Sequence, residues 1–433
     1  MHNKVIKSLL NARLIDPESS LDQKGGLLIE DGLIRDFGPH IDQKYCTQRE
    51  ITAQDCQQQI VMPGLVDMRV QIQPIGQNLE DSLVKTSNMA VVSGVTSLVC
   101  VPTASLIFDQ VNKVSYLQQK AKELAKSKLY TYGAITQNLS GQQITEMGLL
   151  KQAGVLGFTE GVKSLDHPKV FNRALNYAQN FNSLILQFAE DQRLADGSVA
   201  TQTALSIDMG LPSVPAMAEA MQITRDLHFV AASQANYHCF PVSTRLSATV
   251  LKQAKEKSLP VSCSTSPSYF ILNEQVVCGY NSFARLSPPL RSQDDQSAVI
   301  QAIQHNIIDC ICSDHTPIDS EGKTNTFNQS TAGIMMLPFL FPLTLELYRH
   351  HEVRLINLLK LITCNPAKVL GLPQGRLKIG SPADLIVVDI DSPTILPSLD
   401  QVFANHLGLF QDIKMHGRIL QTYVDGRLVH NLF

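Results

Sequence analysis

The sequence predicts an α/β protein, a (β/α)8 TIM-like barrel with a small β-sandwich domain formed by both chain termini. Strand-like runs alternate with amphipathic helical stretches through the middle of the chain, which is typical of βαβ units and a parallel sheet. Both ends of the chain instead carry β-rich runs with Asp-Gly turns. The length of 433 residues suits one large barrel with an appended domain.

The terminal runs predict β-hairpins at opposite ends of the chain. Residues 27–37 place Asp31-Gly32 between short β-prone segments, and residues 421–429 repeat this pattern at Asp425-Gly426. Such turns need central residues that tolerate positive φ. Residues 385–389 add another strand. Because isolated hairpins are only marginally stable in water, we expect both ends to pair into one composite β domain.

The middle of the chain contains eight strand-like runs, the number that a closed barrel needs. They are 65–72, 97–101, 130–134, 155–159, 184–189, 237–242, 261–264 and 308–313. Amphipathic stretches at 111–125, 168–180, 244–257 and 293–304 lie between many of them. We therefore expect the barrel over residues 61–375 and the composite β domain over residues 1–60 plus 376–433.

Composition restricts the class of protein. The chain has 36 Lys and Arg against 39 Asp and Glu, a formal net charge of -3, and no block of basic residues. Neither nucleic acid nor an anionic membrane is supported as a partner, since both select clustered positive charge. The nine Cys include no Cys-x2-Cys pair, which indicates reduced thiols. With no signal-peptide pattern at the N-terminus, we expect a cytoplasmic protein.

Short motifs at the predicted strand ends carry a family resemblance. They occupy residues 63–67, 93–102, 237–244, 287–292, 313–317, 364–368 and 381–385. In this order and at these intervals they resemble the dihydroorotase family, the cyclic amidohydrolases of pyrimidine biosynthesis, over nearly the whole chain. The resemblance implies a barrel whose chemistry lies at the carboxyl ends of the strands.

The resemblance also implies a metal site, but most of its ligand positions hold other residues here. The family's first strand ends in His-x-His, and those positions are Arg69 and Gln71. Its next two ligand histidines correspond to Phe188 and Pro241. A guanidinium repels a metal ion, and an aromatic ring or a proline ring offers no donor atom. Only Asp314 remains, a ligand and general base in the family, and we predict it to be vestigial, with no metal and no cofactor.

The positions that the family uses for substrate recognition have changed as well. They correspond to Gln73, Ser105, Ser287 and Ile318. Gln73 stands where the family has an Arg that pairs with the substrate carboxylate, so the charge-assisted bidentate contact is lost. Glu160 and Lys163 are candidates for one further metal-ligand position that the resemblance does not fix. Neither could hold a metal centre by itself.

Other histidines and cysteines offer weaker candidates. His238 and His315 match positions that the family usually fills with His, but not ligand positions, so packing or hydrogen bonding is favoured over catalysis. Cys310 and Cys312 alternate on the eighth strand, would line the barrel interior together with Asp314 and could suggest a soft-metal pair, but buried core thiols are the more common case.

These positions lead to the hypothesis of a non-catalytic dihydroorotase homologue. The resemblance implies a structural or regulatory subunit in a complex with aspartate carbamoyltransferase, as a hetero-oligomer or homo-oligomer. One alternative is an active dihydroorotase or related cyclic amidase with an unusual, mononuclear metal site around Asp314 and Glu160. Another is a sensor whose altered pocket, lined by Arg69, Gln71, Gln73 and Phe188, binds an anionic nucleotide or metabolite.

Overall fold

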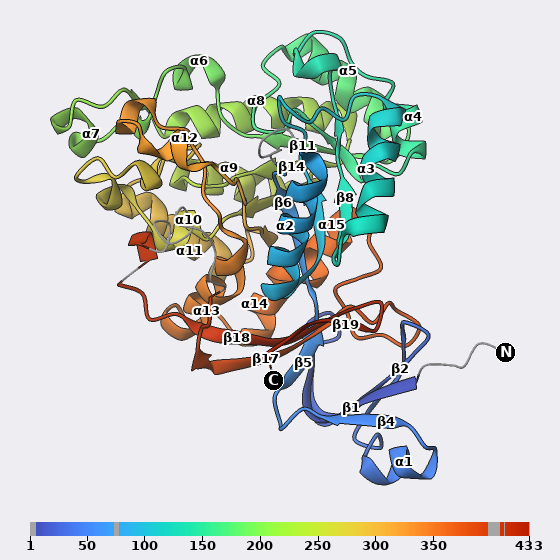
Figure 1. Cartoon of the computed structure of the whole chain (residues 1–433). Coiled ribbons are helices and arrows are strands. Elements are labelled where there is room, and N and C mark those ends of the chain that lie inside the picture. Colours follow the sequence, from blue (N-terminus) through green and yellow to red (C-terminus); the bar gives the residue numbers. More distant parts are fainter. Residues whose placement is uncertain (1–5, 73–77, 397–407, 411, 433) are drawn as a thin grey trace.

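The computed structural model describes residues 6–72, 78–396, 408–410 and 412–432 of the chain. Its central element is a set of parallel strands surrounded by helices (Figure 1). These strands are β6 (Leu65–Val70), β7 (Val95–Cys100), β8 (Lys128–Thr131), β9 (Gly133–Ala134), β10 (Gly157–Thr159), β11 (Leu184–Phe188), β14 (Tyr237–Phe240), β15 (Val261–Thr265) and β16 (Cys310–Ile311).

These strands pair in the order in which they occur along the chain. One parallel group runs β6-β7-β8 and the other runs β9-β10-β11-β14-β15-β16. Only Tyr132 separates β8 from β9, so the two form one interrupted strand that joins the groups. On the other side, the Gln71 amide donates to the His315 carbonyl at 2.8 Å, next to a parallel bridge between Val70 and His315. The arrangement is consistent with a (β/α)8 barrel, and we refer to it as the barrel.

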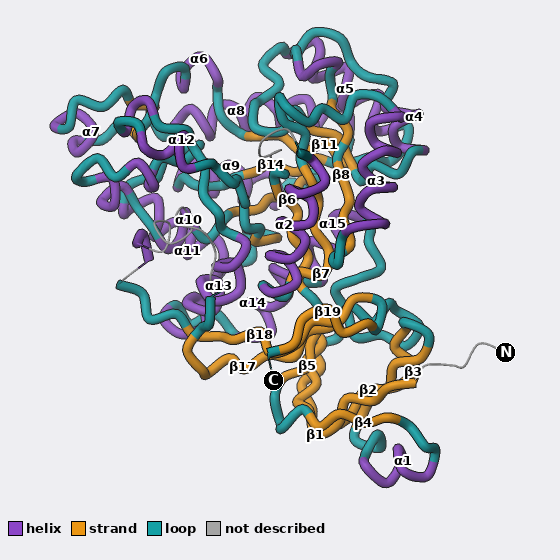
Figure 2. The backbone as a smooth tube through the Cα atoms, in the orientation of Figure 1, coloured by secondary structure: helices purple, strands orange, loops and turns teal. Residues whose placement is uncertain are grey.

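Helices cover the outside of the strands (Figure 2). They are α2 (Leu79–Val92), α3 (Val111–Leu124), α4 (Met147–Gln152), α5 (Pro168–Gln179), α6 (Gln192–Ala195), α7 (Ala204–Asp208), α8 (Met217–Ser233), α9 (Arg245–Glu256), α10 (Ser268–Ile271), α11 (Gln293–Gln304), α12 (Ser320–Thr324), α13 (Leu340–His350), α14 (Leu355–Ile362) and α15 (Cys364–Leu370). A further helix, α1 (Gln43–Gln48), lies away from the barrel, among the strands of the N-terminal part of the chain (Figure 1). The predicted amphipathic stretches correspond to α3, α5, α9 and α11. Short polar side chains set where two of these begin: Thr244 accepts from the Ser247 amide at α9, and Ser292 accepts from the Asp295 amide at α11.

The barrel strands are buried on both faces. Outward-facing residues pack against the helices, while Val66, Met68, Leu186, Phe240 and Cys310 belong to an interior cluster that fills the barrel. Burial on two faces explains why these strands are continuous apolar runs that lack the alternation of a half-exposed sheet.

Strands from the two chain ends form one eight-stranded sheet below the barrel (Figure 1). Its members are β1 (Ile6–Asp16), β2 (Leu21–Glu30), β3 (Leu33–Gly38), β4 (Thr52–Asp55), β5 (Ile60–Pro63), β17 (Leu385–Pro393), β18 (His416–Val424) and β19 (Arg427–Asn431). The ends join where β17 pairs antiparallel with β5, in the register Leu385 to Pro63. Both Asp-Gly sites form turns with positive φ at Asp31, Gly32, Asp425 and Gly426.

The expected pairing of the two chain ends is therefore present, whereas the two-layered sandwich and the domain boundaries stay predictions. A separate pair of short strands, β12 (Ala200–Thr201) and β13 (Ser213–Val214), lies among the helices. Within the described ranges, no helix combines the length and the apolar character needed to cross a membrane.

Candidate active site at the carboxyl ends of the strands

A cavity of about 310 Å³ opens at the carboxyl ends of the barrel strands. Its lining comes from the end of β6, from α10 and from the loops after β10, α10 and β16. The residues are Arg69, Gln71, Val162, Ser268, Leu286, Ser287, Asp314, Thr316, Thr331, Ala332, Gly333 and Ile334. We call this cavity the strand-end pocket. It lies where barrels of this class place their chemistry.

The charged groups of this pocket are Arg69 and Asp314, which form an ion pair. The Arg69 Nε donates to Asp314 Oδ1 at 2.8 Å, and the Arg69 side chain is only 2% exposed. The Arg69 Nη1 donates to the Gly161 carbonyl at 3.0 Å. Among the described residues, no hydrogen bond engages Arg69 Nη2 or Asp314 Oδ2. The pair thus fixes a guanidinium and a carboxylate side by side and leaves one polar atom of each available to a ligand.

Two aromatic rings support the guanidinium. The Arg69 Cζ lies 4.6 Å from the ring centroid of Phe240 and 5.5 Å from that of Phe188. A cation over an aromatic face is stabilised electrostatically, and the effect grows where water is excluded. Phe188, at a position where the family resemblance implies a metal ligand, therefore helps to stabilise the permanently charged guanidinium of Arg69.

Asp314 has an unusual backbone and a perturbed carboxyl group. Its φ is +57°, in the left-handed region, where Asp is tolerated better than most residues. Burial raises the pKa of the Asp314 carboxyl above its ordinary value, and Arg69 opposes this shift through its charge and its hydrogen bond. The group is therefore a stronger base than an exposed aspartate, although a cation touches it.

Gln71 and Asp67 complete the end of β6. The Gln71 Nε2 donates to the Thr316 hydroxyl at 2.8 Å, which joins the first strand to the loop after the last. Asp67 Oδ1 accepts from the amides of Arg69 at 3.2 Å and Ser313 at 3.1 Å. Burial raises the pKa of Asp67 to about 6. These contacts hold the two chain segments that carry Arg69 and Asp314 in one position.

A second buried charge cluster lies beside the pocket. Arg291 Nη2 is 3.3 Å from Glu190 Oε1 and 3.4 Å from Glu219 Oε2, and all three side chains are at most 5% exposed. Arg291 Nε also donates to the Ser243 hydroxyl at 2.9 Å. Glu190 follows β11 and Ser243 follows β14, so this cluster ties neighbouring strand ends together.

The remaining predicted substrate positions are only partly brought together. Ser287 lines the strand-end pocket. Ile318 is buried outside the pocket lining, and Ser105 is exposed and bonds to Thr103 through its hydroxyl. Gln73 lies outside the described residues. Pro241 is buried directly after β14 and does not line the pocket.

Glu160 and Lys163 do not join Asp314. The Glu160 carboxylate accepts from the Thr136 amide at 2.7 Å and the Thr136 hydroxyl at 2.8 Å, and burial raises its pKa to about 7. Lys163 is exposed. His238 lies inside the barrel, with Nδ1 2.8 Å from the Ser262 hydroxyl and Nε2 2.7 Å from that of Ser264. His315 Nδ1 accepts from the Leu337 amide at 3.4 Å.

The two cysteines belong to the core. Cys310 and Cys312 are fully buried in the cluster that fills the barrel, and burial raises the pKa of both thiols far above the ordinary value. Both groups are therefore neutral thiols at physiological pH. This environment suits a packed core residue and opposes the thiolate form that binds metals.

The donor set at the strand ends does not fit the metal centre that the resemblance implies. Arg69 brings a permanent positive charge, Phe188 and Pro241 bring no donor atom, and Asp314 is already paired with Arg69. Throughout the described part of the chain, no three His, Cys, Asp or Glu side chains form a group that could hold a metal ion.

Several of these contacts go beyond what the sequence motifs predict. Arg291 and Asp314 lie in the motifs and Arg69 is one of the replaced ligand positions, but nothing in the sequence shows which of them pair, and Glu190 and Glu219 lie in none of the motifs. The available signal in the sequence is a set of three polar positions, since Asp67 and Arg69 interrupt the otherwise apolar β6 and Gln71 directly follows it. A buried charge in a core strand requires a partner, and here the loop after β16 supplies it.

Comparisons with known proteins agree with this architecture. Residues 58–247 match the Dihydro-orotase-like family model, and residues 204–429 match that of the Amidohydrolase family. The chain is 31% identical to a dihydroorotase of Ehrlichia chaffeensis over 430 residues, with 99% of this chain and 96% of the relative covered. It is 32% identical to dihydroorotases of Anaplasma phagocytophilum, with 99% and 96% covered, and Syntrophotalea carbinolica, with 98% and 99% covered.

The fold has close structural neighbours as well. The L-hydantoinase (dihydropyrimidinase) of Arthrobacter aurescens superposes with a TM-score of 0.84 at 20% identity, covering 98% of this chain and 96% of that one. A D-hydantoinase superposes with a TM-score of 0.81 at 17% identity, covering 98% and 95%. At these identities the likeness shows the fold alone.

The relatives correct the prediction that this chain is not an enzyme. That prediction, and with it the structural or regulatory role, is wrong because full-length relatives at 31–32% identity carry the name of an enzyme. It equated the replacement of metal ligands with the loss of all chemistry, whereas the replaced positions contribute a fixed cation beside a carboxylate. Physical association with aspartate carbamoyltransferase, and the oligomeric state, stay predictions.

Proposed function

Because the chain belongs to the dihydroorotase family of amidohydrolases, we propose that its strand-end pocket binds a dihydroorotate-like cyclic amide and catalyses opening and closing of the ring. The observation that carries the proposal is the Arg69–Asp314 pair, which places a cation and a base 2.8 Å apart at the wall of this cavity. A volume of about 310 Å³ is within the usual range for small-molecule pockets.

Charged and uncharged polar groups of the pocket both contribute to recognition of such a ligand. Arg69 Nη2 can donate to a carbonyl or carboxylate oxygen. Ser287 and Thr331 bring exposed hydroxyls to the rim of the pocket, and Gln71 with Thr316 brings a paired amide and hydroxyl to its wall. Leu286 and Ile334 provide an apolar surface for the ring. This is the combination of a few fixed polar groups and an apolar wall that small-molecule sites use.

Arg69 and Asp314 together carry out hydrolysis of the ring amide. Asp314 takes a proton from water as the water oxygen adds to the ring carbonyl, and the negative charge that develops on the carbonyl oxygen is stabilised by Arg69. The proton then passes from Asp314 to the ring nitrogen as the C–N bond breaks. The raised pKa of Asp314 suits a group that must both accept and return a proton. Arg69 acts as a fixed cation that is present before the charge develops.

The test is turnover of dihydroorotate to N-carbamoyl-aspartate, followed in both directions. The protein is produced in a host that lacks its own dihydroorotase, and Arg69→Met, Asp314→Asn and the exposed-site control Lys44→Gln are purified identically. We expect measurable turnover in the unaltered protein and in Lys44→Gln, a loss of at least about 100-fold in the two pocket variants, and no effect of EDTA. Equal rates in all four proteins, or no turnover above the uncatalysed rate, would refute the proposal.

A further inference from the structure

Two segments that lie apart in the sequence meet at the strand-end pocket. The segment before α11 contributes Leu286 and Ser287 to the lining, and the loop after β16 contributes Thr316 and residues 331–334. We call residues 282–287 and 316–334 the rim segments. The second of them includes the short helix α12. The shape of the pocket therefore depends on how these two segments are held together.

A lysine of α12, Lys323, joins the rim segments. Its Nζ donates to the carbonyl of Ser282 at 3.1 Å and to that of Arg285 at 3.2 Å. In return, the Ser282 hydroxyl donates to the Lys323 carbonyl at 2.6 Å. Three hydrogen bonds thus connect one residue of the loop to the facing segment.

Backbone hydrogen bonds extend this contact to the pocket lining. The Gly333 amide donates at 3.1 Å to the Arg285 carbonyl, the same oxygen that accepts from Lys323. The Thr331 amide donates at 2.8 Å to the carbonyl of Gly322, which precedes Lys323 in the chain. Lys323 therefore supports Thr331 and Gly333, and both of these residues line the pocket.

The burial of Lys323 has an energetic cost. The residue is 2% exposed, although Glu321 and Thr324 of the same helix are exposed. Among the described residues, no carboxylate pairs with its ammonium group. Burial, together with the like charge of Arg285, lowers the pKa of Lys323 to about 7. Because a lysine in a short surface helix could keep its ammonium group in water, the carbonyls of the facing segment must hold this side chain in place.

We propose that Lys323 is a positioning residue of the strand-end pocket, which fixes the rim for ligand binding and takes no part in the chemical step. The inference rests on the function proposed above for this pocket. Arg69 is held by Asp314 and by the Gly161 carbonyl, and both of these residues lie outside the rim segments.

Loosening the rim should therefore affect binding and not chemistry. It lowers the fraction of molecules whose pocket can bind, and the apparent affinity falls by that fraction. Once substrate saturates the protein, every molecule has the closed rim, so the maximal rate is unchanged. Phe327 belongs to one apolar cluster with Ala284, Leu286 and Ile334, which keeps the loop attached when Lys323 is replaced.

The test compares dihydroorotate turnover by the unaltered protein and by Lys323→Met. We expect KM to rise at least about 10-fold, which corresponds to about 1.4 kcal/mol of binding free energy, and kcat to change by less than about 2-fold. Ser282→Ala removes only the hydroxyl that donates to Lys323 and is a milder form of the same test. It should raise KM by about 2- to 5-fold.

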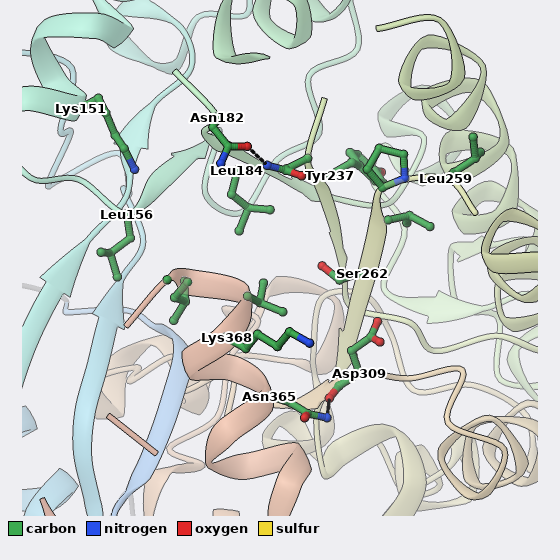
Figure 3. Close-up of a pocket in the computed structure, with 16 residues that line it drawn as sticks. Lys151, Leu156, Asn182, Leu184, Tyr237, Leu259, Ser262, Asp309, Asn365 and Lys368 are labelled. Carbon is green, nitrogen blue, oxygen red and sulfur yellow. Dashed lines mark hydrogen bonds between the residues drawn. The ribbon is translucent and has the colours of Figure 1, made fainter. Parts of the chain in front are cut away.

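The matched control is Lys255→Met, which removes a half-buried lysine with similar contacts. Lys255 Nζ donates to the Ile307 carbonyl and to Asp309 Oδ2, both at 2.6 Å. Asp309 lies at the opposite end of the barrel, where it lines a second cavity, of about 680 Å³, together with the first residues of β11, β14 and β15 (Figure 3). This variant should be less stable than the unaltered protein but keep its KM and kcat.

Hydrogen exchange at the amides of Thr331 and Gly333 reports on the rim without any substrate. We expect both amides to exchange at least about 10-fold faster in Lys323→Met, and at the unaltered rate in Lys255→Met. Unchanged exchange or an unchanged KM in Lys323→Met overturns the inference.

Two other results also overturn it. A fall in kcat at constant KM would place Lys323 in the chemical step, and an equal rise in KM in Lys255→Met would reduce the effect to a general loss of stability. If the unaltered protein shows no turnover, the function proposed for the pocket is refuted. The exchange comparison then decides by itself whether Lys323 holds the rim.

Discussion

Positively charged side chains have opposite environments at the two ends of the barrel. At the carboxyl end, Arg69 and Arg291 are almost fully buried, and each is paired with carboxylates of this same chain. At the amino end, Lys151 and Lys368 line an open cavity without such partners in the described residues. The difference separates two uses of a positive charge. A buried, paired cation is held in one position and meets a ligand only through the N–H groups that its partners leave free, whereas an accessible unpaired cation offers its whole charge to a ligand.

The strongest test of this contrast is Arg291→Met. It leaves Glu190 and Glu219 buried together without a cation, so we expect a loss of about 3–5 kcal/mol in the free energy of unfolding. The measurement is chemical denaturation at pH 7.

Arg13→Met serves as the matched control, because it breaks an ion pair with Asp22 whose two side chains are 42% and 44% exposed. We expect it to cost no more than about 1 kcal/mol. If Arg291→Met costs as little as this control, the buried cluster does not stabilise the strand ends, and the contrast between the two barrel ends fails.

Arg69→Met sharpens the comparison inside the strand-end pocket. Arg69 lowers the pKa of Asp314 against the effect of burial, so its removal raises that pKa further. A carboxyl whose pKa is raised in the folded state favours folding below its unfolded pKa, and this contribution is lost as pH rises through the folded pKa. The variant should therefore lose more stability at pH 8 than at pH 5, with a loss of about 3 kcal/mol at the higher pH.

The double variant Arg69→Met/Asp314→Asn isolates this effect, since it has neither charge. Its stability relative to the unaltered protein should vary much less between pH 5 and pH 8. If Arg69→Met showed the same loss at both pH values, Asp314 would not be the group that responds to Arg69.

The barrel strands can be predicted from the sequence because they are long apolar runs. Such runs can be recognised without knowing which distant residues they contact. All eight runs contain observed strand residues, although the run 130–134 is interrupted at Tyr132, and β16 covers only Cys310–Ile311 of the run 308–313. Hydrogen bonding to neighbouring strands determines where each strand begins and ends, and the sequence of one strand does not encode that bonding. The longest helix among the described residues, α8, is not one of the amphipathic stretches that the sequence predicts.

The candidate site shows more clearly what cannot be predicted from the sequence. Arg69 and Asp314 are 245 positions apart, and their pairing depends on the closure of the barrel between β6 and the loop after β16. The family resemblance points to both positions, but for the first it implies only a lost metal ligand. The alternative interpretation is that the guanidinium is a paired cation. It depends on the carboxylate, the Gly161 carbonyl and both aromatic rings, which come together only in the folded structure.

The smallest expected effect lies at the amino end and completes the comparison. Lys151→Gln/Lys368→Gln should change the free energy of unfolding by no more than about 0.5 kcal/mol, because neither lysine stabilises a partner within the described chain. Lys255→Gln, in contact with the same cavity lining, should cost about 1–2 kcal/mol, since it leaves the Asp309 carboxylate unpaired. Urea denaturation of both variants separates an unpaired charge from a structural one. An equal loss in the two would mean that the unpaired lysines are structural after all, and that the two ends of the barrel do not differ in the way proposed.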